Sequence, residues 1–427
     1  MQLNDTHDPK RRSWLESANR PDTDFPIQNL PLGIFSDAGG GMRGGIAIGD
    51  SILDLAAAIG AGLFRGDAED AARAAAGPAL NPLMALGNEA ASALRNAVSA
   101  ILTEGSGDRG KAEPCLVPME GATMALPAEI GSFTDFLTSL DHTLRMSPNG
   151  RTPPAFDRIP IAYHGRATTV CVSGTPLVRP HGQFAGPDGA TVFGPEPAQD
   201  FELELGIFVG PGNRRGMPIP IDRAPFHVFG YCLLNDWSAR GIQFFESVPL
   251  GPFLGKSMMT SISPWVVTAE ALAPFAAPAR ERDPGKEPPE HLSSEADQSG
   301  GGLDIAMFAD WSTAAMRRGG TPPGTVVETN FRTMYWTPAQ MLCHHASNGC
   351  ELRPGDLLGS GTVSGPAETS RACLAEISGK GTRTIEVGGE TRTWLEDGDE
   401  ISFRARAERA GHAAIGFGVC RGVVAPR

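Results

Sequence analysis

Tyrosine, paired cysteines and long apolar runs are all scarce in this chain of 427 residues. Only three tyrosines occur, at positions 163, 231 and 335. The seven cysteines contain no Cys-x-x-Cys pair, which favours free thiols in a reducing compartment over a disulfide framework or a zinc site. No stretch approaches 18 apolar residues, and residues 1–24 offer no apolar segment long enough for a signal peptide. We therefore expect a cytoplasmic protein with no membrane partner.

Basic residues are also fewer than acidic residues. The chain has 36 lysines and arginines against 49 aspartates and glutamates, a net charge of −13, which repels nucleic-acid backbones and argues against a nucleic-acid partner. Glycine and proline are abundant, at 53 and 36 residues, and they cost about 1 and 3 kcal/mol in helix interiors. This composition excludes a helical bundle or repeat array. We expect a chain rich in turns and short strands, long enough for more than one domain.

The pattern along the chain divides it into two parts. Residues 54–64 and 81–102 are rich in alanine and leucine at helical spacing, and a short strand is expected at 45–50. The composition changes at 114–127, where this small N-terminal unit ends. Beyond it, short apolar runs such as 168–172 and 207–209 are each followed by turn residues, which is typical of a β-rich domain. The polar segment 277–302 is expected to be a surface excursion. The fold class is therefore a β-rich α+β fold.

Four acidic residues stand in positions that suit a metal site. The segment 201–205 alternates apolar and acidic residues, so as a strand it would place Glu202 and Glu204 on one face. Asp236 follows an apolar run and is expected at a strand end, and Asp135 lies among phenylalanines. Four carboxylates without nearby cysteine or histidine ligands suit Mg²⁺ or Ca²⁺ rather than zinc. A strand with a solvated acidic face is the alternative for the pair at 202 and 204.

A histidine could supply a general base beside these acids. His142 lies seven residues after Asp135, close enough for one loop or helix to present both side chains to a shared site. A histidine whose tautomer is fixed by a carboxylate can take a proton from water near neutral pH. On composition alone His164, His344 and His345 are equally eligible, so the residues themselves leave the base open.

Several longer motifs resemble the fumarylacetoacetate hydrolase family in its long form, which has an N-terminal domain. The motifs are DFPIQNLP at 24–31, AIGD at 47–50, YHGRA at 163–167, VGPGNR at 209–214, NDWSAR at 235–240, VPLGPFLGKS at 248–257 and LRPGDLL at 352–358. The resemblance implies a small SH3-like barrel over residues 1–120 and a larger catalytic β-roll domain over residues 121–427. It also implies a homodimer.

The same resemblance implies roles for individual residues. The carboxylates that would hold the divalent cation, Mg²⁺ or Ca²⁺, are Asp135, Glu202, Glu204 and Asp236, and a secondary metal position falls on Lys256 and Thr260. His142 would activate water and Glu376 would orient it. The groups that would stabilise the oxyanion and the carbanion are Arg151, Gln243 and Lys256. The residues that would contact the substrate are Arg151, Tyr163, Gln243 and Thr362.

The implied activity is the metal-dependent hydrolysis of a carbon–carbon bond in 4-fumarylacetoacetate, a small β-diketo acid. The products would be fumarate and acetoacetate, in the last step of tyrosine and phenylalanine degradation. The alternatives are a related acylpyruvate hydrolase, an oxo-acid decarboxylase or isomerase of the same superfamily, and a catalytically silent binding protein. At two positions where the family has tyrosines that help to hold the substrate, this chain has Leu137 and Ser247.

Overall fold

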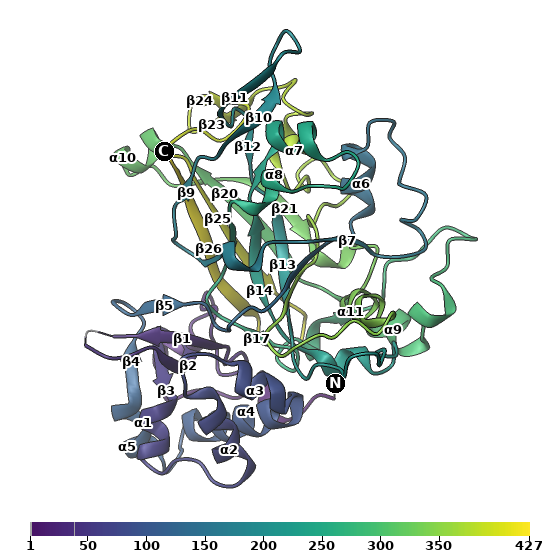
Figure 1. Ribbon diagram of the computed structural model, residues 1–427. Coiled ribbons are helices and arrows are strands. Elements are labelled where there is room, and N and C mark those ends of the chain that lie inside the picture. The colour runs from purple at the N-terminus through teal and green to yellow at the C-terminus, as the bar shows by residue number, and fades with distance from the viewer. Residues whose placement is uncertain (1, 38) are drawn as a thin grey trace.

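The structure of the protein is a computed structural model that describes residues 2–37 and 39–427. Residues 1 and 38 of the expected N-terminal unit therefore lie outside the described residues. The first part of the chain, purple in Figure 1, forms a lobe of short strands and helices, and the rest forms a larger lobe dominated by strands. This confirms a β-rich mixed fold. The SH3-like form of the first lobe and a boundary at residue 120 stay predictions.

The N-terminal lobe pairs one antiparallel sheet with a group of helices. The strand order is β4-β3-β2-β1-β5. The strands are β1 (Leu32–Ser36), β2 (Arg43–Ile48), β3 (Ser51–Asp54), β4 (Leu116–Pro118) and β5 (Thr123–Ala125). The helices are α1 (Leu55–Gly60), α2 (Asp67–Ala75), α3 (Asn81–Leu86), α4 (Asn88–Leu102) and α5 (Arg109–Ala112). The single helix expected at 81–102 is divided at Gly87, whose φ of 84° an L-residue rarely adopts.

A mixed sheet runs through the larger lobe and carries most of the predicted site. Its order is β7-β6-β22-β13-β14-β16-β8, and β17 also pairs with β14. The strands are β6 (Phe133–Leu137), β7 (Ile161–His164), β8 (Val170–Val172), β13 (Leu203–Val209), β14 (Val228–Asp236), β16 (Thr260–Ile262), β17 (Val267–Thr268) and β22 (Leu357–Gly359). Every residue of β13 and β14 is buried, so these two strands form the centre of the lobe.

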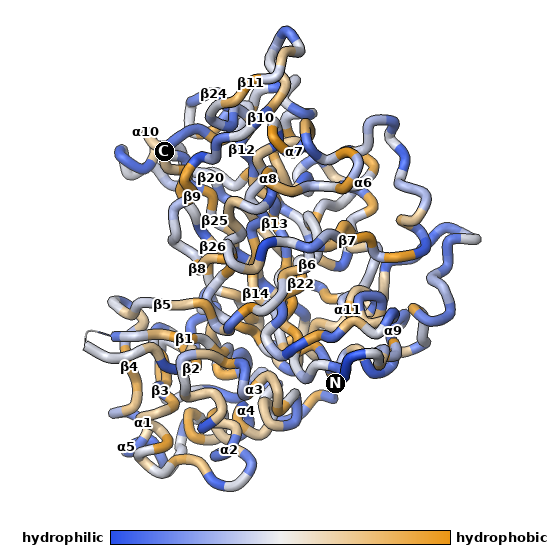
Figure 2. Tube along the Cα trace, in the orientation of Figure 1, coloured by the Kyte–Doolittle hydropathy of each residue, from blue (hydrophilic) through white to orange (hydrophobic). Residues whose placement is uncertain are grey.

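A second sheet, in the order β21-β20-β25-β26-β9, shares one apolar core with the first. Its strands are β9 (Leu177–Val178), β20 (Ala306–Ser312), β21 (Gly324–Asn330), β25 (Glu400–Ala407) and β26 (Ile415–Ala425). The rings of Phe201 and Phe403 meet in this core, edge to face, with centroids 5.7 Å apart. Hydrophilic residues mark outer loops such as the tip between β10 (His181–Ala185) and β11 (Thr191–Pro195) (Figure 2).

Short elements at the ends of the strands complete the lobe. The helices are α6 (Leu140–Met146), α7 (Arg240–Glu246), α8 (Leu254–Ser257), α9 (Glu295–Gly300), α10 (Ala314–Gly319), α11 (Pro338–Ala346) and α12 (Leu374–Ile377). Besides β10 with β11, the two-stranded pairs are β12 (Gln199–Asp200) with β15 (Ser238–Ala239), β18 (Ala276–Ala277) with β19 (Gly302–Leu303), and β23 (Ile385–Val387) with β24 (Glu390–Arg392). The segment 277–302 is largely exposed or half-buried, but Leu292 is fully buried and anchors it in the core. Within the described part of the chain, no helix has the length and apolar character needed to cross a membrane.

Candidate active site

The four predicted metal ligands converge at one place in the central sheet. Asp135 lies on β6, Glu204 on β13, Glu202 just before β13, and Asp236 at the end of β14. All four are buried, and one ligand atom from each lies within 4.8 Å of the others. The strand-end position expected for Asp236 is therefore observed, and the acidic face of 201–205 is buried rather than solvated.

A glycine makes room for two of these carboxylates. Gly359 ends β22, which lies between β6 and β13 in the sheet. A Cβ atom built at this position would lie 2.5 Å from Asp135 Oδ1 and 3.0 Å from Glu204 Oε2. The first distance is too short for any real contact, so a side chain at residue 359 would fill the space between the two acids.

Cationic and hydroxyl groups surround Asp236 and Glu202. Lys256 Nζ lies 2.5 Å from Glu202 Oε2 and 2.8 Å from Asp236 Oδ2. Thr260 Oγ1 donates a hydrogen bond to Asp236 Oδ1 (3.0 Å), and the Tyr163 hydroxyl donates to Asp236 Oδ2 (2.8 Å). The two residues of the predicted secondary metal position thus contact the carboxylates directly.

The acids differ in how they are charged. Burial and the neighbouring carboxylates, chiefly Asp236 for Asp135 and Asp135 for Glu204, raise the pKa values of both acids well above their ordinary range. Burial also opposes ionisation of Glu202, but Lys256 and Arg240 outweigh it and lower the pKa of Glu202 to about 2. Cations thus keep Glu202 ionised, whereas at Asp135 and Glu204 burial and the neighbouring carboxylates outweigh the opposing effect of Lys256 on the pKa.

These residues fit a hard divalent cation. Asp135 Oδ1 and Glu204 Oε1 are buried and have no hydrogen-bond partner in the structure. Unsatisfied buried carboxylate oxygens are costly, and a metal ion would satisfy both. Carboxylate oxygens alone suit Mg²⁺ or Ca²⁺. The four carboxylates could therefore hold a metal ion, and the chemistry of the donors does not choose between these two.

The predicted base and its orienting acid are in contact. Ser139 caps α6 by accepting a hydrogen bond from the backbone N–H of His142, and this places the imidazole on the first turn. His142 Nδ1 lies 2.8 Å from Glu376 Oε2, although the two residues are 234 positions apart in the chain. Both are buried. The other ring nitrogen, Nε2, lies 3.5 Å from Thr362 Oγ1.

Four side chains hydrogen-bond to the Glu376 carboxylate, and one of them is Cys373, whose Sγ lies 3.4 Å from Oε2. The same Oε2 accepts a hydrogen bond from Ser364 Oγ (2.6 Å) as well as pairing with His142, and Oε1 lies 3.1 Å from Arg145 Nη1. Burial alone would raise the pKa of Glu376, but His142, Ser364 and Arg145 together lower it to about 2. Glu376 is therefore a carboxylate at neutral pH and favours the Nδ1–H tautomer of His142.

The two remaining predicted residues, Gln243 and Arg151, differ in what they contact. Gln243, half-buried on α7, accepts a hydrogen bond from Arg240 Nη1 at its Oε1 (3.1 Å). Arg151 is exposed on the loop after α6, and its backbone N–H donates a hydrogen bond to Asn149 Oδ1 (3.1 Å). The structure therefore does not bring Arg151 to the carboxylates, and its role stays a prediction.

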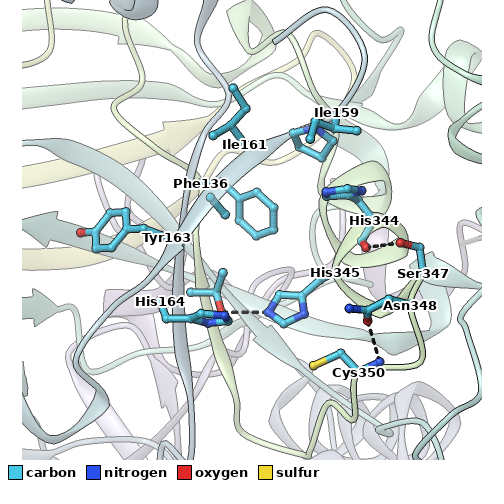
Figure 3. A pocket seen from close by; sticks show the side chains of 13 residues that line it. Phe136, Ile159, Ile161, Tyr163, His164, His344, His345, Ser347, Asn348 and Cys350 are labelled. Atoms are coloured by element: carbon cyan, nitrogen blue, oxygen red, sulfur yellow. Dashed lines mark hydrogen bonds between the residues drawn. The ribbon is translucent and has the colours of Figure 1, made fainter. Parts of the chain in front are cut away.

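The three other candidate histidines line one cleft, and Tyr163 is also among the residues that line it. His164, His344 and His345 line a cleft of about 420 Å³ beside β6 and β7 (Figure 3). Side chains alternate along a strand, and the register pairs Thr134 with His164 and Asp135 with Tyr163. Thr134 and His164 thus face the cleft, where Thr134 Oγ1 contacts His345 Nε2 (2.8 Å), while the Tyr163 hydroxyl reaches Asp236.

The two positions that lack the family's tyrosines carry no free hydroxyl group. Leu137 packs, partly buried, against the main core. Ser247 Oγ donates to the backbone carbonyl of Gln243 (2.5 Å) and so serves the end of α7.

Sequence reasoning did not single out three polar residues that hold the site together. These are Arg240, Arg145 and Ser364. Arg240 is the last residue of the NDWSAR motif and is 1% exposed, so the motif itself was the available signal. Nothing in the local sequence marks Arg145 or Ser364, because their importance arises only from contacts more than ten residues away.

Comparison with known proteins agrees with the division of the chain into two lobes. Residues 132–425 match the family described as fumarylacetoacetate (FAA) hydrolase C-terminal, and residues 28–127 match the fumarylacetoacetase N-terminal family. The two matches follow the order of the two lobes. The chain belongs to the fumarylacetoacetate hydrolase family.

Individual relatives are similar over almost their whole length. The chain is 45% identical to a fumarylacetoacetase of Bos taurus over 95% of this chain and 97% of that protein. It is 41% identical to a fumarylacetoacetase of Oryza sativa over 97% of both chains. Among solved structures, a fumarylacetoacetate hydrolase from psychrophilic Exiguobacterium antarcticum superposes with a TM-score of 0.50 at 16% identity, covering 93% of this chain and all of that one, which supports the fold.

Proposed function

We propose that this protein hydrolyses the carbon–carbon bond of 4-fumarylacetoacetate to give fumarate and acetoacetate, in tyrosine and phenylalanine degradation. It is a hydrolase that acts on carbon–carbon bonds, as its family and its full-length relatives indicate. The observation that carries the proposal is the convergence of four buried carboxylates on one point, together with a buried His142–Glu376 pair.

In this proposal His142 is the base that activates water. With its Nδ1–H donated to Glu376, the neutral ring keeps Nε2 free to accept a proton. Glu376 holds the ring in this tautomer and stabilises the imidazolium that forms, as the carboxylate does in a nucleophile–base–orienter triad. Thr362, 3.5 Å from Nε2, would help to orient the water or the substrate.

Cleavage leaves a carbanion, and its charge needs cationic or hydrogen-bond donors. A divalent cation bound by the four carboxylates, Mg²⁺ or Ca²⁺, would supply Lewis-acid stabilisation of the substrate oxygens. Lys256 lies beside Glu202 and Asp236 and would present its ammonium group to the developing charge. Gln243 is held by Arg240, and its amide N–H would act as a second donor. Arg151 would act in the same way and would bind a substrate carboxylate after movement of its loop, and Tyr163 would contact the substrate beside Asp236.

We further propose that the protein acts as a homodimer in a reducing cytoplasm. The segment between α7 and α8 exposes an apolar surface in which Val248 is 87%, Leu250 95% and Phe253 69% exposed. An exposed apolar cluster of this kind is typical of a surface that another chain covers. All seven cysteines are free thiols, which suits a reducing compartment.

The direct test is to supply the purified protein with Mg²⁺ or Ca²⁺ and fumarylacetoacetate. We expect consumption of the substrate with release of acetoacetate, and a fall of several orders of magnitude for His142→Ala. His345→Ala is the matched control, because this side chain contacts Thr134, on the face of β6 opposite Asp135, and its loss should leave turnover near the wild-type value.

The outcome separates the alternatives. Full turnover in His142→Ala would refute the mechanism. Release of carbon dioxide instead of acetoacetate would point to a decarboxylase. Absence of divalent-cation binding by calorimetry, together with no turnover of any acylpyruvate, would favour a catalytically silent binding protein.

A further inference from the structure

Asp200 is a fully buried carboxylate that the mechanism above does not use. Its Oδ1 accepts hydrogen bonds from the backbone N–H groups of Leu374 (2.6 Å) and Phe201 (2.7 Å). Its Oδ2 accepts from the backbone N–H of Ala375 (3.0 Å) and from Arg240 Nε (2.8 Å). Four donors on one carboxylate use nearly all of its acceptor positions.

These bonds join three separate segments of the chain. Asp200 belongs to β12, which pairs with β15, and Glu202 forms a bridge with Cys373 at the start of α12. The first segment continues into Glu202, the second leads into Arg240 and α7, and the third carries Glu376 on α12. Asp200 therefore contacts the three chain segments that carry Glu202, Gln243 and Glu376.

The contact with α12 compensates for a missing cap. Cys373 is the N-cap residue of this four-residue helix and its side chain forms no capping hydrogen bond. The N–H groups at the start of a helix need acceptors, and Asp200 supplies them from another strand. The orientation of α12, and with it the place of Glu376, thus depends on a side chain 176 residues earlier in the chain.

Through its contact with Arg240, Asp200 also influences the positions of side chains on the other side of the site. With Nε bound to Asp200, the guanidinium directs Nη1 to Gln243 Oε1 (3.1 Å) and places Nη2 2.8 Å from Glu202 Oε1. The guanidinium group of an arginine is planar and rigid, so a rotation that breaks the hydrogen bond to Asp200 would also move the hydrogen bond to Gln243 and the ion pair with Glu202.

We propose that Asp200 is a positioning residue that holds the His142–Glu376 pair in place relative to Glu202 and Gln243. The inference rests on the proposed function for its kinetic consequence. An asparagine of the same shape cannot replace Asp200, because its NH₂ group would have to face two of the four donors. The expected defect is a displaced base with the substrate-binding groups still present.

The test compares Asp200→Asn with Asp399→Asn. Asp399 is an equally buried carboxylate that accepts hydrogen bonds from Arg392 Nε and from the backbone N–H of Glu396. It lies in the second sheet region and contacts no predicted site residue among those described, so it reproduces the loss of a buried Asp–Arg pair away from the site. Both variants should unfold at a lower temperature than the wild type.

Two readouts are taken below the unfolding temperature of both variants. In Asp200→Asn, kcat per folded molecule should fall by at least 30-fold while KM changes less than threefold, and Asp399→Asn should keep both constants. By ¹H NMR, the downfield signal of the His142 Nδ1–H that is bound to Glu376 should weaken or shift in Asp200→Asn and persist in Asp399→Asn.

Equal kcat values for the two variants, or an unchanged His142 signal in Asp200→Asn, would overturn the proposal. The NMR readout requires no turnover, so it tests the positioning role even if the wild type does not hydrolyse fumarylacetoacetate, an outcome that would count against the proposed function alone. If Asp200→Asn does not fold, Asp200→Ser, which keeps one acceptor and leaves space for water, carries the same expectations.

Discussion

The change Glu376→Gln tests the role of the orienting acid with almost no change in shape. The carbonyl of the glutamine can face either His142 and Ser364 or Arg145, but not both sides. If its NH₂ group faces His142, the ring must adopt the other tautomer, and Nε2 then carries the proton and cannot act as a base. If it faces Arg145, two donors oppose each other at a position where the glutamate oxygen lies 3.1 Å from Nη1.

The magnitude follows from the charge that is lost. The partners of Glu376 lower its pKa from 4.5 to about 2 against the effect of burial. A shift of this size corresponds to about 3 kcal/mol, which is a factor of about 10² in rate if the same interaction stabilises the imidazolium. Loss of the correct tautomer can cost a total of about 10⁴ in a triad of this kind. We therefore expect kcat to fall by about 10²- to 10⁴-fold with little change in KM.

The same substitution has a pH-dependent effect on stability. Because the pKa of Glu376 is lowered on folding, its contribution is fully present above the unfolded-state value near 4.5 and is lost as the pH falls towards 2. Urea unfolding at pH 7 should show Glu376→Gln to be less stable than the wild type by up to about 3 kcal/mol, and the difference should narrow by roughly 1 kcal/mol at pH 3.5.

The control is Glu270→Gln, a buried glutamate that accepts hydrogen bonds from Asn4 and Ser92 between the two lobes. This variant should keep the wild-type kcat. If stopped-flow or steady-state assays gave Glu376→Gln a kcat within tenfold of the wild type, the assignment of Glu376 as the orienting acid would be wrong.

Three other predictions concern the metal ligands and the exposed segment. Lys256→Met should lower kcat by about 10²- to 10³-fold, because it removes a preorganised cation, and an unchanged kcat would contradict this role. The same change should lower the melting temperature in EDTA, because the negative charges of Glu202 and Asp236 then repel each other without the lysine between them. Because the pKa values of Asp135 and Glu204 are raised on folding, their stabilising contribution is present at low pH and lost as the pH rises. The protein in EDTA should therefore melt at a lower temperature at pH 8 than at pH 5.5, and Mg²⁺ or Ca²⁺ should reduce this difference. An equal difference in melting temperature with and without metal would argue against the metal site. Leu250→Asp should convert the proposed dimer to a monomer in analytical ultracentrifugation, whereas a wild type that already sediments as a monomer would refute the proposal of a dimer.

The sequence was sufficient for the class of fold and for the grouping of four acidic residues. Alternation at 201–205 placed Glu202 and Glu204 on one side of a strand, and the apolar run before Asp236 predicted its strand end. The division of the helix at Gly87 was not predicted, because the periodicity of 81–102 continues across a residue whose positive φ is visible only in three dimensions.

The supporting contacts of the site could not be predicted from local pattern. Ser364 reaches Glu376 across twelve residues and Arg145 across 231, and neither lies in a motif that marks it. Among the histidines, composition left four candidates, and only the fold shows that three of them line a cleft beside β6 and β7, whereas His142 contacts Glu376. Hydrogen bonds between distant segments are decided by how the strands are ordered, which spacing along the chain does not encode.

The position of Gly359 has a consequence for ion choice. The gap between Asp135 and Glu204 is bounded by main chain, since β22 is hydrogen-bonded to β6 on one side and to β13 on the other. Side chains can change rotamer to fit a larger or smaller ion, but strands in a sheet keep a spacing of about 4.8 Å. The wall of the site on this side is thus main chain, which has no rotamers, so that any adjustment to ions of different radius would be made by the side chains of the four carboxylates.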